Sequence, residues 1–133
     1  IRQETEAFFG IQSLVKREKF QVLGSDVLRY EITKIANLNK REEAKKNLAL
    51  CSNFVEEHGA TLALAEDLER ACKLSGRDAL HFASAVLGNA ELFITCDQAL
   101  IKKSARINTA LKKINRRIAI ANPLSFLHNF KGE

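Results

Sequence analysis

The apolar positions of this chain alternate between helical stripes and short continuous runs. Helical spacing predicts helices over residues 1–19, 27–36, 40–57, 66–74, 78–87, 98–106 and 123–130. Short apolar runs predict strands at residues 20–24, 92–95 and 117–121, and residues 60–64 form either a strand or an extended link. This alternation indicates a mostly parallel sheet with helices on both faces, a three-layer α/β/α sandwich. The strands are few for such a sheet, so we expect one to be missing from this chain.

Length and composition predict one globular domain that spans residues 1–133. Hydrophobic residues make up 46% and charged residues 28% of the chain, as in ordinary soluble proteins, and no apolar run has the length of a membrane span. Cys51, Cys72 and Cys96 are too widely spaced for a zinc site or a disulfide framework, which favours a reducing, cytoplasmic location. The chain begins at Ile1 and contains no methionine, so we expect it to be part of a longer polypeptide.

Three carboxylates occupy positions where a metal site would place them. Glu31 projects within the apolar face of the helix over 27–36, between Val27 and Ile35, and a buried carboxylate needs a cation, a proton or a metal ion. An arginine partner or a place at the rim of the face would also explain it. Asp78 begins one helix, and Asp97 follows the apolar run 92–95; either could simply cap a helix. Together the three predict a shared site for a hard cation beyond the carboxyl ends of the strands.

Basic residues gather in the last quarter of the chain. Residues 98–133 contain eight basic side chains and one acid, Glu133, whereas residues 1–97 contain thirteen bases and fifteen acids. This asymmetry favours a polyanion held near the cation site, although a solvated basic helix face is an equal alternative. The basic residues proposed for contact are Lys102, Lys103, Arg106, Lys112, Lys113, Arg116 and Arg117.

Other candidates for chemistry are weaker. His81 falls on the polar side of its helix with Ser84, so we expect it to be exposed or satisfied by a partner, without a role. Ser25 and Ser104 have no nearby base of the kind that activates a nucleophile. The sequence also lacks the glycine-rich loops that hold nucleotide phosphates.

Four segments in this order resemble the PIN-domain ribonucleases, of which VapC-type toxins are the most numerous relatives. The segments are Ser25-Asp-Val-Leu-Arg-Tyr-Glu31, residues 76–85, residues 92–97 and residues 118–127. The resemblance implies four or five parallel strands between helices, an acidic pocket, and cleavage of RNA with Mg²⁺ or Mn²⁺. Glu31, Asp78 and Asp97 match the family's second, third and fourth acids, as catalytic residues and metal ligands. Thr95 matches a catalytic-site hydroxyl that supports the last acid, while Cys96 stands where the family often has a small polar residue.

The beginning of the chain departs from the family pattern. In the family, a first acid ends an apolar strand that precedes the helix predicted at residues 1–19, and neither the strand nor the acid is present here. The resemblance therefore predicts an N-terminally incomplete PIN-like domain that lacks one strand and one metal ligand. The activity of the 133-residue form itself is accordingly in question.

The expected function is that of a metal-dependent endoribonuclease, such as the toxin of a toxin–antitoxin pair. RNA, an antitoxin protein and a second copy of the chain are the partners that this function implies, and no membrane is among them. Two alternatives stay open. One is a catalytically inactive PIN-like module that binds protein or nucleic acid, and the other is a metal-dependent phosphoesterase acting on DNA or small phosphate esters.

Overall fold

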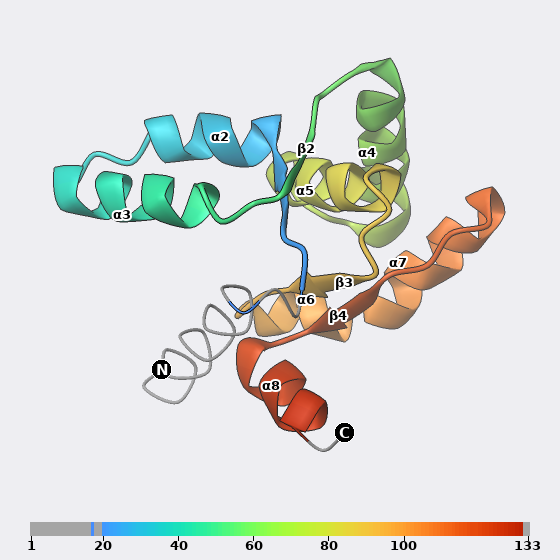
Figure 1. Cartoon of the computed structure of the whole chain (residues 1–133). Helices are drawn as coiled ribbons and strands as arrows, with labels where there is room; N and C mark the ends of the chain where they lie inside the picture. The colour runs from blue at the N-terminus through green and yellow to red at the C-terminus, as the bar shows by residue number, and fades with distance from the viewer. Residues whose placement is uncertain (1–16, 18–19, 132–133) are drawn as a thin grey trace. The chain divides into compact units, whose positions relative to one another are not determined.

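The computed structural model of the chain describes Arg17 and residues 20–131, which divide between two compact units. One unit is Gln21–Ala90, and the other is Ile1–Phe20 with Glu91–Glu133. Figure 1 shows the elements of each unit. The helix predicted over residues 1–19 lies outside the described residues, apart from Arg17.

The unit Gln21–Ala90 is built on a pair of parallel strands. Strand β1 (Leu23–Ser25) pairs with β2 (Asn53–Val55), with Gly24 opposite Phe54. Between the strands the chain forms α2 (Asp26–Thr33) and α3 (Leu38–Leu48), which lie side by side (Figure 1). Two further helices, α4 (Gly59–Cys72) and α5 (Gly76–Leu87), pack against each other after β2.

The contact between α4 and α5 is the core of this unit. The buried residues of α4 recur every three or four positions, as a helical face requires: Thr61, Ala65, Leu68 and Cys72. The buried residues of α5 are mostly small around a fully buried phenylalanine: Ala79, Phe82, Ala83, Ser84 and Val86. Small side chains let the two helices approach closely, and the phenylalanine fills the remaining volume.

The end of α5 lies against the strand pair through a glycine. A Cβ atom at Gly88 would stand 2.5 Å from Val55 Cγ2 and 2.6 Å from Leu23 Cδ2. The Gly88 φ of −83° suits any residue, so the requirement for glycine is steric. This close approach fixes how α5 lies on β1 and β2.

The second unit contains another pair of parallel strands. Strand β3 (Leu92–Ile94) pairs with β4 (Ala119–Ala121), and Phe93 lies opposite Ile120. Helices α6 (Gln98–Lys102) and α7 (Ser104–Leu111) and the short 3₁₀ helix η1 (Lys112–Ile114) connect the strands, and α8 (Pro123–Lys131) follows β4.

A single amide side chain ties α7 to the beginning of β4. Asn108 Nδ2 donates to the carbonyl oxygen of Ile118 at 2.9 Å, and Asn108 Oδ1 accepts from the Ile118 N–H at 2.8 Å. Ile118 is 2% exposed, so its backbone groups need partners inside the protein. The amide therefore completes the hydrogen bonding of the residue that precedes the strand.

The predicted fold class is confirmed: the protein is mixed α/β, with parallel strands packed against helices. Three predicted elements differ from the structure. The helix predicted over 40–57 ends at Leu48, because residues 53–55 pair with β1. Residues 60–64 belong to α4 instead of a strand or link, and in this stretch Thr61 is buried while Leu62 is 48% exposed. The helix predicted over 98–106 is divided at Lys103 into α6 and α7. No helix within the described part of the chain has the length and hydrophobicity needed to cross a membrane.

Candidate functional site

Glu31 lies on α2 beside the first turns of α5. Its Oε1 atom is 2.9 Å from His81 Nε2, and its Oε2 atom is 3.4 Å from Arg77 Nε. Val27 and Ile32, the apolar neighbours of Glu31 on α2, are both buried, whereas the Glu31 side chain itself is 29% exposed. The arginine partner that the sequence left open as an alternative is thus Arg77.

The two oxygens of Glu31 differ in their surroundings. An ionised carboxylate only accepts hydrogen bonds, so His81 Nε2 must carry the hydrogen and donate it to Oε1. Oε2 is shielded from solvent, and it accepts no hydrogen bond among the described residues, although Arg77 lies at ion-pair distance. Glu31 therefore retains one oxygen that is able to coordinate a cation.

Asp78 occupies the first turn of α5, directly after Arg77. Its backbone N–H donates to the hydroxyl of Ser75, which caps the helix. The Asp78 carboxylate is half-buried and makes no hydrogen bond or ion pair with the described part of the chain. The helix dipole favours an acid at this position, and both carboxylate oxygens are left available.

Asp97 follows β3 and caps α6. Its Oδ1 atom accepts from the N–H groups of Ala99 at 2.9 Å and Leu100 at 3.4 Å. The hydroxyl of Thr95 accepts from the Asp97 N–H at 3.1 Å, while the Thr95 N–H donates to Ala121 on β4. Oδ2 accepts no hydrogen bond from the described residues, and the side chain is exposed. One oxygen of Asp97 orders the turn and the other stays open.

The structure places these acids in two units. Glu31 and Asp78 belong to Gln21–Ala90, and Asp97 and Thr95 belong to the other unit. Within the part of the chain that the structure describes, no group of three or more His, Cys, Asp or Glu side chains is arranged to hold a metal ion. The assignment of the three acids to one site therefore stays a prediction.

The predicted RNA-contacting residues all lie between Lys102, the last residue of α6, and Arg117, shortly before β4. All are exposed except Lys103, which is half-buried. Lys112, Lys113 and Arg117 make no ion pair with the described residues. Their charge is therefore available to an anion.

Sequence reasoning gave no role to the residues that contact Glu31. Of the two alternatives predicted for His81, exposed or satisfied by a partner, the structure shows the second. Ser84 is buried rather than on a polar side, because α5 contacts α2, α4, β1 and β2. The one feature of the sequence that could have pointed to a role for His81 and Arg77 is that both lie within one helical turn of Asp78. This spacing could not identify Glu31 as the partner of His81, because the two residues are 50 positions apart in the chain.

The cysteines do not form part of this arrangement. None of the three forms a disulfide among the described residues, and Cys72 is buried. Burial raises the pKa of the Cys51 thiol above its ordinary value, so this thiol stays protonated and unreactive at neutral pH. Cys96 is exposed between Thr95 and Asp97.

The family model described as PIN domain matches residues 8–106, which include Glu31, Asp78, Thr95 and Asp97. No curated protein and no solved structure matches the chain significantly.

Proposed function

Because the chain belongs to the PIN domain family, whose members are mostly metal-dependent nucleases, we propose that it is an endoribonuclease that hydrolyses RNA phosphodiester bonds with Mg²⁺ or Mn²⁺. The observation that carries the proposal is a shared property of the three acids. Glu31, Asp78 and Asp97 each retain at least one carboxylate oxygen that makes no hydrogen bond with the described residues.

Carboxylate oxygens fit the proposed cofactor, because Mg²⁺ and Mn²⁺ prefer hard oxygen ligands. Asp78 and Asp97 would hold the ion, and Glu31 would hold a second ion or orient the attacking water. A bound ion of this kind lowers the pKa of water and neutralises charge on the phosphate. Such a reaction requires no covalent intermediate with the protein.

The Thr95 hydroxyl would keep Asp97 in place for this role. It accepts a hydrogen bond from the Asp97 N–H, while the amides of α6 hold Asp97 Oδ1. Both contacts direct the carboxylate without using Oδ2. We therefore include Thr95 in the proposed catalytic site as a positioning residue.

The basic residues of the second unit would contact the RNA backbone. Phosphate contacts of this kind give affinity that depends on salt and little on base sequence. The cluster that we define as the basic turn consists of Lys112, Lys113, Arg116 and Arg117, on η1 and the segment after it.

Cleavage of RNA by the purified protein tests the proposal. We expect Glu31→Gln and Asp97→Asn each to lower the rate of RNA cleavage with Mn²⁺ at least about 100-fold, because each removes an anionic oxygen from the reacting centre. Asp67→Asn is the matched control, since Asp67 is exposed on α4 and pairs only with Arg70 among the described residues. If both site variants cut as fast as wild type, the assignment is wrong.

The same preparations distinguish the alternatives. Cleavage of RNA but not of single-stranded DNA or a generic phosphodiester supports the ribonuclease, and equal cleavage of all three supports a broader phosphoesterase. Binding of RNA with no cleavage under any metal condition supports the inactive module.

A further inference from the structure

The contact between His81 and Glu31 joins α5 to α2 at the proposed site. The two side chains are 21% and 29% exposed, so water has limited access to the hydrogen bond between them. His81 is the only described residue that donates a hydrogen bond to the Glu31 side chain. The orientation of this carboxylate therefore depends on one side chain from a different helix.

The bond also determines which oxygen of Glu31 remains available. His81 occupies Oε1, and Oε2 is left without a hydrogen bond beside Arg77. Arg77 is 72% exposed, so it can leave Oε2 and be solvated by water at little cost. Carboxylates that bind metal ions are commonly held by such hydrogen bonds to their second oxygen.

We propose that His81 is a positioning residue that holds Oε1 of Glu31 and thereby presents Oε2 to the divalent ion. This inference rests on the proposed function, because it takes Glu31 as a metal ligand. Arg77 has the opposite role. Its positive charge lies 3.4 Å from Glu31 Oε2 and therefore competes with the ion for this oxygen.

We therefore expect replacement of Arg77 and replacement of His81 to have opposite effects on the affinity for Mn²⁺. Replacing Arg77 by glutamine removes a competing charge, and Mn²⁺ should bind as tightly as in wild type or more tightly. Replacing His81 by leucine removes the positioning bond, and the affinity for Mn²⁺ should fall about 10- to 100-fold. A histidine that served only as a second counter-charge would behave like Arg77.

Two amide variants separate positioning from general packing. The Gln side chain places its amide nitrogen near the position of His Nε2, whereas the shorter Asn side chain places it near Nδ1. We expect His81→Gln to retain most of the Mn²⁺ affinity and His81→Asn to lose it as leucine does. Mn²⁺ binding is measured without RNA from the electron paramagnetic resonance signal of the free ion, on variants whose thermal unfolding is also recorded.

A double-mutant cycle with Glu31→Gln completes the test. If His81 acts through Glu31, adding His81→Leu to Glu31→Gln causes no further loss of affinity. Equal affinity of wild type and Glu31→Gln for Mn²⁺ would overturn both the ligand assignment and this inference. A loss for Glu31→Gln, with His81→Gln and His81→Asn indistinguishable, would overturn the inference alone.

Discussion

Glu31 and Asp97 are assigned to one reaction, yet the two units of the protein hold them in different ways. Glu31 depends on His81 and Arg77, which come from another helix about 50 residues later. Asp97 is held by the hydroxyl of Thr95 and by two backbone amides, all within three residues. The geometry of Glu31 is therefore a product of tertiary packing, and that of Asp97 is encoded locally.

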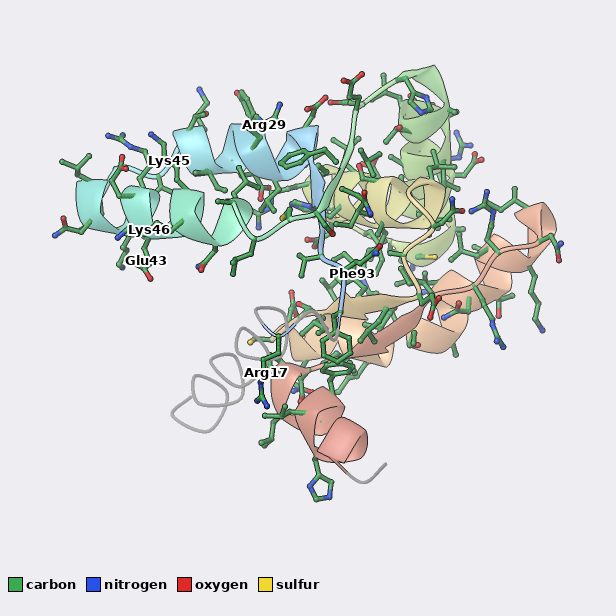
Figure 2. All side chains as sticks on the ribbon, viewed as in Figure 1. Arg17, Arg29, Glu43, Lys45, Lys46 and Phe93 are labelled. Carbon is green, nitrogen blue, oxygen red and sulfur yellow. The ribbon has the colours of Figure 1, made fainter. Side chains whose placement is uncertain are left out.

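The units also differ in charge. Residues 91–133 contain eight basic and three acidic residues, whereas residues 21–90 contain nine basic and ten acidic ones. In the unit Gln21–Ala90, several bases pair with acids one turn away, as in Arg29–Asp26, Lys45–Glu42 and Arg70–Asp67. Figure 2 labels Arg29, Lys45 and Lys46 on this unit. The basic turn has no acidic residue one turn away in the sequence, because residues 98–132 contain none. The proposed RNA-contacting charge thus lies in one unit, and the packing-dependent acid Glu31 lies in the other.

The largest expected effect tests the difference in charge. Replacing the four residues of the basic turn by glutamine should reduce the slope of log affinity for single-stranded RNA against log salt by about 3, equivalent to roughly a 50-fold change between 50 and 200 mM salt. The physical reason is that each lost phosphate contact removes the release of a counter-ion. Fluorescence anisotropy with labelled RNA over a salt series measures the slope.

A matched variant keeps the total charge change constant. Four exposed lysines of the other unit are replaced by glutamine: Lys34, Lys40, Lys45 and Lys46. This variant should leave the slope close to that of wild type. Equal slopes for the two variants would show that net charge alone attracts the RNA. The proposed difference between the two units in RNA attraction would then be wrong.

The next effect tests the dependence of Glu31 on packing. Gly88→Ala should lower the free energy of unfolding by about 1–3 kcal/mol, because the added methyl group overlaps Val55 and Leu23. Where α5 shifts to relieve the overlap, rather than the Leu23 and Val55 side chains, the contact of its His81 with Glu31 should loosen too. Chemical denaturation measures the stability, and the NMR shifts of the His81 ring report the contact.

Gly59→Ala is the control for this substitution. Nothing lies within 4 Å of a Cβ atom at Gly59, which begins α4, so alanine there should be neutral or stabilise the protein by up to about 1 kcal/mol. A Gly88→Ala protein as stable as the Gly59→Ala protein would mean that α5 does not depend on the close approach.

The same distinction between local and distant contacts explains which parts of the structure could be predicted. The run at residues 92–95, the following Asp97 and the helix that begins near Asp78 are local patterns, and the structure contains each of these elements close to the predicted bounds. The role of Thr95 beside Asp97 came from the resemblance to the PIN family. These are features that a few neighbouring residues determine.

Elements that depend on distant partners were not predictable. Asn53-Phe54-Val55 continues a polar helical sequence, and it becomes a strand because β1 supplies hydrogen-bonding partners 30 residues earlier. Gly24 allows this pairing, because a Cβ atom there would stand 2.9 Å from the ring of Phe54. The contact of Glu31 with His81 could not be predicted for the same reason, because no local spacing relates two residues 50 positions apart.

The smallest expected effect tests the local character of the Asp97 site. Thr95→Val removes the acceptor of the Asp97 N–H, and stability should fall by only about 0.5–1 kcal/mol, because water replaces the hydroxyl at this exposed turn. Thr95→Ser keeps the acceptor and should restore the wild-type value. Hydrogen exchange of the Asp97 amide should accelerate in the valine variant while the His81 ring shifts stay constant. A change at His81 would show that the Asp97 turn is coupled to the packing around Glu31, and the division into a local and a packed acid would no longer hold.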